Sequence, residues 1–160
     1  DMEIPGVETI TGSIPEGEEP LDRTEAGYGQ GLDLASPFGM ALVSATAARG
    51  ELPVPFLVQG EQTHVSEVPA PIDPQAIDEL RQLMAAVTGP GGTAGGLSAG
   101  GDIRGKTGEA EINGGSHAWF TGYRVDDDIA FATLVVLGGG SEAAVAVTDR
   151  MLLNLDAPAP

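Results

Sequence analysis

The chain has 160 residues, 41% of them hydrophobic, and its 24 acidic and 7 basic side chains give a formal net charge of −17. This length is enough for one domain-sized core, and the negative charge disfavours nucleic acid and anionic membrane surfaces as partners. Because the sequence has no cysteine, it cannot form disulfides, thiolate metal sites or a cysteine nucleophile.

The first third of the chain is predicted to hold loops followed by one helix. Residues 1–35 are rich in glycine, proline and acidic side chains, which favours extended loops and turns. Ser36 then offers an N-cap with proline at the next position, and Gly50 marks the end of a helix. One face of this helix would carry Met40, Val43 and Ala47.

The middle of the chain is predicted to contain an extended stretch and a second helix. Residues 51–68 are interrupted by prolines and are expected to be extended, with a short hairpin around Gly60. Asp73 followed by proline repeats the cap signal, and Gly89 ends the helix. Its apolar face would be formed by Ile77, Leu80, Met84 and Val87. Residues 90–101 are glycine-rich with too few apolar side chains to pack, which predicts a flexible connection.

Three strands and a final helix are predicted in the last third. The strands cover residues 102–112, 118–125 and 129–137, and three aspartates between the last two make a polar turn that implies antiparallel pairing. The third strand is apolar on both faces, which predicts a central place in a sheet covered by helices. Ser141 can cap a helix that faces the sheet with Ala144, Val147, Met151 and Leu155. The predicted fold class is α/β (α+β), an antiparallel sheet covered by helices.

Residues 100–107 match the spacing of a phosphate-binding loop, in which main-chain amides and a lysine hold phosphate groups. That mechanism needs a buried strand before the loop and a helix that begins at Lys106. Glycines lie on both flanks, and the net charge also disfavours a nucleotide. Nucleotide binding is therefore the least favoured function.

The same lysine opens a second motif, Lys106-Thr107-Gly108, which occurs in serine acyl-transferases that bind penicillin. Three residues are a weak signal, but their surroundings strengthen it. The chain resembles the C-terminal half of class B penicillin-binding protein transpeptidases through GYGQGLDLASPFGMALVSATAARGELPVPFLV, GGTAGG, GKTGEAE and HAWFTGYR. The resemblance implies that family's fold. It also implies a peptidoglycan D,D-transpeptidase activity that passes through a serine acyl-enzyme and is acylated by β-lactams.

The resemblance also implies a role for each residue of the motif. Lys106 would supply positive charge beside the nucleophile and the substrate. Thr107 would bind the terminal carboxylate of a stem peptide or of a β-lactam, and Gly108 would leave room for substrate on the strand. The main-chain amide of Glu109 would be one of two donors to the oxyanion. The family has a small hydroxyl residue at this last position, so the Glu109 carboxylate is expected to repel an anionic substrate unless it turns away or pairs with a cation.

Two further motifs of that family do not occur in this sequence. Neither serine, two residues, lysine nor serine, one residue, asparagine is present. Residues 1–160 are therefore expected to be the C-terminal portion of one transpeptidase domain, inactive alone and stable only beside the N-terminal remainder of the same protein. The other implied partners are peptidoglycan stem peptides and β-lactams, with no cofactor. The implied location is the bacterial cell envelope, at the outer face of the cytoplasmic membrane, with the anchor outside this chain.

Two other functions remain open from the sequence. A serine β-lactamase or β-lactam sensor shares the Lys-Thr-Gly strand, although the long first segment of the resemblance favours the transpeptidase. A catalytically inactive envelope scaffold is the other alternative, favoured by the departure at Glu109.

Several other conspicuous residues are interpreted as structural. The two histidines are too isolated for a metal site, and the neighbouring tryptophan and phenylalanine suit a strand better than a stacking platform. Bracing of the glycine-rich GYGQG segment is the favoured role of its tyrosine and glutamine. These residues are His64, His117, Trp119, Phe120, Tyr28 and Gln30.

Overall fold

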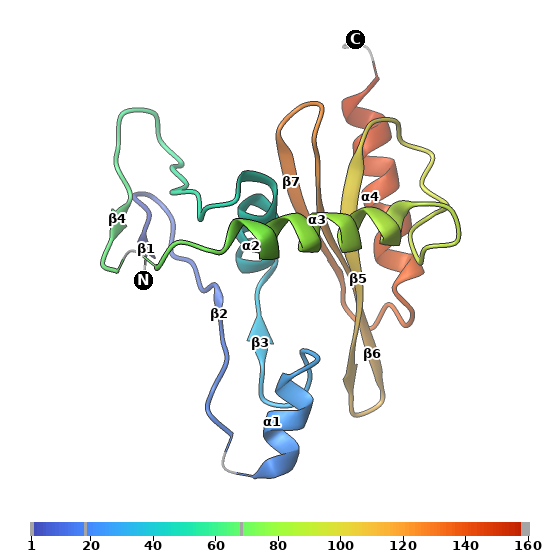
Figure 1. Ribbon diagram of the computed structural model, residues 1–160, viewed down its shortest axis with the longest axis horizontal. Helices are drawn as coiled ribbons and strands as arrows, with labels where there is room; N and C mark the ends of the chain where they lie inside the picture. The colour runs from blue at the N-terminus through green and yellow to red at the C-terminus, as the bar shows by residue number, and fades with distance from the viewer. Residues whose placement is uncertain (1, 18, 68, 158–160) are drawn as a thin grey trace.

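The computed structural model describes residues 2–17, 19–67 and 69–157, and its centre is a three-stranded antiparallel sheet (Figure 1). The strands are, in spatial order, β5 (Ile103–Ile112), β6 (Gly115–Arg124) and β7 (Ile129–Val135). In Figure 1 helix α3 (Pro74–Thr88) crosses one face of the sheet and helix α4 (Glu142–Leu155) lies behind the other. The predicted fold class is confirmed.

Tight turns join the three strands and set their register. Asn113 and Gly114 connect β5 to β6, and Gly114 has a φ of 97°, a conformation that glycine adopts without steric cost. The aspartate turn connects β6 to β7, as predicted, and Asp128 takes a left-handed φ of 54°. The sequence prediction placed the start of the second strand at Ala118, but the ladder begins at Gly115.

Helix α4 packs on one face of the sheet. Ala118 and Phe120 of β6 are fully buried there and contact Ala144 and Leu152 of the helix. The ring of Phe120 also meets that of Phe131 on β7, with 5.4 Å between ring centroids. This cluster is the larger part of the core.

The opposite face is covered by α3 and by helix α2 (Pro37–Arg49). Ala47 of α2 and Met84 of α3 pack together against Tyr123 of β6. The buried hydroxyls of Ser44 and Thr121 lie 2.5 Å apart and tie α2 to the same strand. Side chains alternate between faces along a strand, so the even-numbered and odd-numbered residues of β6 define the two layers.

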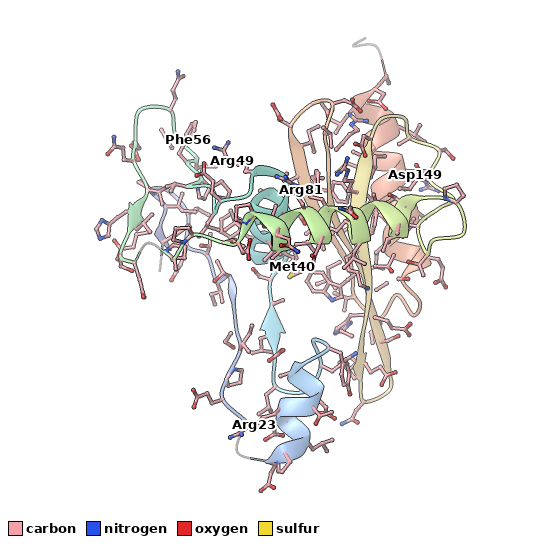
Figure 2. The ribbon with its side chains drawn as sticks, in the orientation of Figure 1. Arg23, Met40, Arg49, Phe56, Arg81 and Asp149 are labelled. Carbon is pink, nitrogen blue, oxygen red and sulfur yellow. The ribbon has the colours of Figure 1, made fainter. Side chains whose placement is uncertain are left out.

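The predicted helix caps are confirmed for α2 and α3. The Ser36 hydroxyl accepts the amide of Gly39 at 3.0 Å, and Gly50 ends α2 in the left-handed conformation, with a φ of 86°. Arg81 of α3 donates to the carbonyls of the last α2 turn, at 2.8 Å from Ala47 and 2.8 Å from Ala48. Figure 2 shows Arg81 between the two helices, where its hydrogen bonds hold α3 against the end of α2.

The predicted inward faces are wrong in part for all three helices. In α2 the buried residues are small, namely Gly39, Ser44 and Ala47, and they let the helix approach the sheet closely. Val43 lies outside this face and is 53% exposed. In α3, Ile77 and Met84 are buried while Leu80 is not. Helix α4 buries a stripe at four-residue spacing, so Val147, Met151 and Leu155 face outward instead. The buried stripe is Ala144, Thr148 and Leu152.

The buried threonine explains why the α4 stripe was missed. Thr148 is polar, but its hydroxyl donates to the carbonyl of Ala144 at 3.0 Å and lies 2.7 Å from the hydroxyl of Thr133. With its hydrogen bonds made, the side chain can face the core. Ser141 is the N-cap residue of α4, as predicted, but its backbone already has helical angles and its side chain makes no capping bond.

The N-terminal region is more regular than predicted. Helix α1 (Pro20–Ala26) lies within the stretch expected to be loops, and its Asp22 carboxylate accepts the amide of Glu19 at 3.0 Å. Short strands also pair here: β1 (Met2–Glu3) with β4 (His64–Val65), and β2 (Gly12–Ser13) with β3 (Leu34–Ala35). The hairpin predicted around Gly60 is therefore wrong, because β4 pairs with β1. Residues 1 and 68, which end two predicted stretches, lie outside the described residues.

The glycine-rich segment before β5 is packed, contrary to the prediction. Ala94 is buried in the α4-side core, and its amide donates to the carbonyl of Val87 at 2.9 Å. A Cβ on Gly92 would lie 2.2 Å from that carbonyl oxygen, so only glycine allows the loop to fold back on α3. Asp149 of α4 accepts the amides of Ser98 and Ala99 at 2.8 Å each and anchors the other half of the loop (Figure 2).

Within the described residues, no helix has the length and apolar character needed to cross a membrane.

Candidate functional site

The four predicted site residues lie in the middle of strand β5. Lys106, Thr107, Gly108 and Glu109 are consecutive residues of the β5–β6 ladder, opposite Thr121 to Ala118. The strand continues unbroken to Ile112, so no helix begins at Lys106 and no helix N-terminus faces a phosphate. The geometry excludes the phosphate-binding interpretation and places the motif in an extended ribbon.

Strand β5 is an edge strand, and its outer edge exposes polar main-chain groups. In the described part of the chain it pairs with β6 alone, so alternate residues point their N–H and C=O groups away from the sheet. Three odd-numbered carbonyls accept side-chain donors on that outer edge. The bonds run from Thr88 Oγ1 to Ile103 at 2.6 Å, from Lys106 Nζ to Thr107 at 2.6 Å and from Gln30 Nε2 to Glu109 at 2.8 Å.

The direction of the Glu109 carbonyl fixes that of its amide. In an extended strand, the N–H and C=O of one residue point to the same side. Because Gln30 reaches the Glu109 carbonyl from outside the sheet, the Glu109 N–H is also directed to the open edge. The strand therefore presents one main-chain donor at the position predicted for an oxyanion contact.

The side chains of the motif alternate between the two faces of the sheet. Lys106 is opposite Thr121, whose hydroxyl meets α2, so its cation starts on the α2 face and is exposed. Thr107 and Glu109 lie opposite Phe120 and Ala118 and so share the α4 face. The Lys106 side chain turns back to the open edge, where Nζ donates to the Thr107 carbonyl at 2.6 Å, whereas the Glu109 side chain leaves the strand on the α4 face.

The hydroxyl of Thr107 already has a partner. Thr107 is buried, with 7% of its surface exposed, and its Oγ1 lies 2.7 Å from the Oγ1 of Thr93 in the glycine-rich loop. Thr93 is itself exposed. The pair forms a short hydrogen-bonded chain that runs from the interior of the site to its surface.

The carboxylate of Glu109 is held by a hydroxyl. Ser116 Oγ on β6 lies 2.7 Å from Glu109 Oε1 and 3.0 Å from the carbonyl oxygen of Gly139, and its single proton can serve one acceptor at a time. Ser116 is buried, so the carboxylate is drawn toward β6 and away from the open edge. The Glu109 carboxylate was expected either to turn away from the substrate or to pair with a cation, and the structure shows that it turns away.

Gly108 is constrained by its cross-strand neighbour. A Cβ at this position would lie 3.2 Å from the Cβ of Trp119, which is tighter than ordinary van der Waals contact. The strand interpretation of Trp119 and Phe120 is confirmed, with Phe120 fully buried and Trp119 partly exposed on the other face. Glycine at position 108 therefore avoids a close contact with Trp119, and it also leaves the strand free of a side chain at this point.

Three contributors to the site were not assigned to it from the sequence. Gln30, Thr93 and Ser116 reach the motif from the GYGQG segment, the GGTAGG segment and the next strand. The first two segments carry the resemblance described above, which was the available signal. The contact of Gln30 with the strand backbone fits the bracing role expected for it, whereas Tyr28 projects outward and is 67% exposed.

The histidines are placed away from the motif or used in the backbone. His117 Nδ1 accepts the amide of Leu137 at 3.0 Å, and Leu137 has a left-handed φ of 55°, so this histidine fixes the turn after β7. His64 lies in β4 and is exposed. In the described ranges, no group of three or more histidine or acidic side chains is arranged to hold a metal ion.

The ion pairs with the most buried arginine lie beside the turn between β6 and β7. Arg124 donates to Asp127 through two nitrogens and to Asp156 at 3.0 Å, and its side chain is 6% exposed. Hydrogen bonding to Arg124 lowers the pKa of the Asp127 carboxyl, and hydrogen bonding to Arg104 lowers that of Asp102. A hollow in the surface here is lined by Gly100, Gly101, Arg124, Asp126, Asp127 and Asp156. Arg124 is paired with Asp127 and Asp156, and Asp126 accepts the amide of Asp102 at 2.8 Å, which suits a structural role.

Comparison with known proteins gives a consistent picture. The family model "Penicillin binding protein transpeptidase domain" matches residues 3–153. A search of curated proteins found no match. The crystal structure of Pseudomonas aeruginosa PBP2 in complex with WCK 5153 is similar, with 29% identity over 82% of this chain and a TM-score of 0.64.

Two structures of one mycobacterial protein share the fold. Penicillin-binding protein A (PBPA) from Mycobacterium tuberculosis is 20% identical over 92% of this chain, with a TM-score of 0.73. Its imipenem acyl-enzyme complex is 20% identical over 94% of this chain, with a TM-score of 0.71. The chain covers 32% of the Pseudomonas protein and 41% and 37% of the two mycobacterial chains, so it corresponds to a minority of each.

Proposed function

Since this chain belongs to the penicillin-binding protein transpeptidase domain family, we propose that it forms the Lys-Thr-Gly side of a serine D,D-transpeptidase that cross-links peptidoglycan. A serine would attack the carbonyl of a D-alanyl-D-alanine stem, forming an ester and releasing the terminal D-alanine. The amino group of a neighbouring stem would then attack that ester, form the cross-link and release the serine.

One observation carries the proposal: the Glu109 amide points to an open strand edge beside an exposed lysine. An acyl donor lying along that edge would place its carbonyl oxygen against the Glu109 N–H, where negative charge develops on attack. Lys106 would lower the energy of the same charge and of the deprotonated nucleophile. The Thr107 hydroxyl would take part in binding the carboxylate of the donor, and Gly108 would keep the strand free of a side chain.

We propose that residues 1–160 are the C-terminal portion of one transpeptidase domain and that the N-terminal remainder supplies the serine. The absence of both serine motifs from the sequence supports this assignment, as does the minor share of each similar structure that the chain covers. Among the described residues no strand pairs with the outer edge of β7, and α4 exposes Val147, Met151 and Leu155. These groups are suited to contact with the remainder of the protein.

The proposed ligands and location follow from the family. The Mycobacterium tuberculosis protein with the same fold forms an acyl-enzyme with imipenem, and we propose that β-lactams acylate the complete protein here as well. The proposed location is the bacterial cell envelope, at the outer face of the cytoplasmic membrane. Stem peptides would be the physiological acyl donors.

Two alternatives share parts of this geometry. A serine β-lactamase or β-lactam sensor would use the same strand edge. A catalytically inactive envelope scaffold is favoured by the departure at Glu109, where the family has a small hydroxyl residue.

Labelling of the full-length protein with a fluorescent penicillin tests the proposal. We expect covalent labelling that persists for many minutes and is lost in Lys106→Ala but retained in Arg150→Ala, which removes an exposed cation from α4. Rapid release of the label would indicate a β-lactamase. Lack of labelling under conditions where a known penicillin-binding protein reacts would refute transpeptidase activity and favour the scaffold.

A further inference from the structure

We propose that Thr93, in the glycine-rich loop before β5, is a carboxylate-binding residue of this site. Its hydroxyl, backed by that of Thr107, would donate to the free carboxylate of the acyl donor. The inference rests on the proposed transpeptidase function and adds a residue from outside the Lys-Thr-Gly motif.

Burial decides which of the two hydroxyls a ligand meets. Thr107 is 7% exposed, whereas Thr93 is exposed, and their oxygens are 2.7 Å apart. When Thr107 donates to Thr93, the proton of Thr93 is free for an acceptor outside the protein. A hydroxyl that accepts one hydrogen bond becomes a stronger donor in the next, so the buried threonine strengthens the exposed one.

The loop holds Thr93 in place before any ligand arrives. The adjacent Ala94 is buried, and its amide bonds to the carbonyl of Val87 at 2.9 Å. On the other side, Gly92 lies so close to the end of α3 that no Cβ fits. Asp149 fixes the following turn through two amides at 2.8 Å. A donor held in this way loses little conformational entropy on binding.

The side chains of Glu109 and Lys106 do not offer a hydrogen-bond donor on the α4 face of the strand. Glu109 shares the α4 face but offers a carboxylate, which is bound to Ser116 and drawn toward β6. Lys106 leaves the strand on the opposite face, and its Nζ donates to the Thr107 carbonyl at the edge, at 2.6 Å. An anion that approaches the edge from the α4 side therefore finds a neutral hydroxyl donor at Thr93.

The test uses the full-length protein and two forms of one β-lactam. Second-order acylation rate constants are measured with benzylpenicillin, which carries the carboxylate, and with its methyl ester, which does not. Thr93→Val removes the hydroxyl at nearly constant shape, and Thr93→Ser retains it. We expect Thr93→Val to slow acylation by the acid about tenfold, the effect of one hydrogen bond to a charged group, with little change toward the ester. Thr93→Ser should stay within about threefold of wild type with both compounds.

The outcomes separate this inference from the proposal on which it rests. Equal rates for Thr93→Val and wild type with the acid would overturn it, and so would an equal loss with acid and ester, which indicates a structural role. Melting temperatures of both variants within a few degrees of wild type exclude misfolding as the cause. A wild-type protein that reacts with neither compound would refute the transpeptidase function, and this inference with it.

Discussion

The side-chain amide of Gln30 donates a 2.8 Å hydrogen bond to the main-chain carbonyl of Glu109, 79 positions further along the chain. This contact joins the N-terminal region to the residue whose amide faces the open edge of β5. Because the carbonyl and amide of Glu109 share one orientation, the glutamine helps to hold the proposed oxyanion donor in position.

Replacement of Gln30 should therefore slow acylation without touching the motif itself. We expect Gln30→Ala to reduce the second-order rate of penicillin acylation several-fold. Gln30→Glu should reduce it further, because a carboxylate facing a carbonyl brings two acceptors together. Gln62→Ala, in an exposed loop before β4, is the matched control and should behave as wild type. A rate for Gln30→Glu equal to that of wild type would show that the contact does not influence the site.

The negative charge of Glu109 should slow acylation by donors that carry a carboxylate, even though Ser116 holds the Glu109 side chain toward β6. Replacement by threonine keeps the main-chain amide and removes the carboxylate, so we expect acylation by benzylpenicillin to become about three to ten times faster, as removal of about 1 kcal/mol of repulsion implies. Glu109→Gln also removes the charge and can still accept the Ser116 hydroxyl, so it should give a similar gain. An unchanged or slower rate in Glu109→Thr would contradict this prediction.

The ion pairs of Arg124 should contribute to stability. Arg124→Met is expected to lower the free energy of unfolding of the full-length protein's transpeptidase domain by about 1–3 kcal/mol. The effect is moderate because the two carboxylates left behind, Asp127 and Asp156, are partly exposed. Arg49→Met is the control, since that side chain is 60% exposed and its pair with Glu51 should contribute little. Equal melting temperatures for the two variants would rule out the stabilising role of Arg124.

Stability should fall in acid through the same pairs. Hydrogen bonding to Arg124 and Arg104 lowers the pKa of Asp127 and of Asp102 in the folded state below the unfolded value of about 3.9. Their contribution is therefore complete above about pH 4 and is lost as the pH falls through the lowered values. The melting temperature measured from about pH 7 to pH 3 should drop more steeply in wild type than in Arg124→Met below about pH 4. Parallel curves would count against the assignment.

The 160-residue chain produced alone should lack a sharp cooperative unfolding transition. In the part of the chain that the structure describes, β7 has no partner on its outer edge, and α4 exposes Val147, Met151 and Leu155, so the largest core is incompletely covered. Thermal unfolding followed by circular dichroism, compared with that of the full-length protein, provides the measurement. A monomeric chain with a cooperative transition would contradict the expectation.

Local signals in the sequence were sufficient for the ends of α2 and α3 and for the strand order. Ser36 and Asp73 cap their helices through their own side chains, and the aspartate turn joins two strands that are adjacent in sequence. Helix faces were predicted less well, because the inward stripe of α4 contains Thr148, whose partner Thr133 is known only once the sheet is formed. Polar residues that are satisfied by tertiary contacts are not visible to an apolar periodicity.

The residues of the site were likewise predicted from the sequence only where the signal is local. The motif itself was recognised from consecutive residues, but Gln30 and Thr93 reach it across 79 and 14 positions of sequence. Ser116 comes from the neighbouring strand. Such contacts depend on strand register and on the fold of the glycine-rich loop, which periodicity does not specify.

The hydrogen-bond donor at the open edge of β5 is the main-chain N–H of residue 109. Mutation of that residue could therefore not easily remove the contact with a ligand that binds this N–H. Every amino acid except proline carries the same N–H at position 109. Escape from an inhibitor bound through that group would therefore have to come from the side chains around it, or from a shift of the strand, which the normal substrate would feel as well. Inhibitors that rely on backbone contacts at this edge should be the slowest to lose potency.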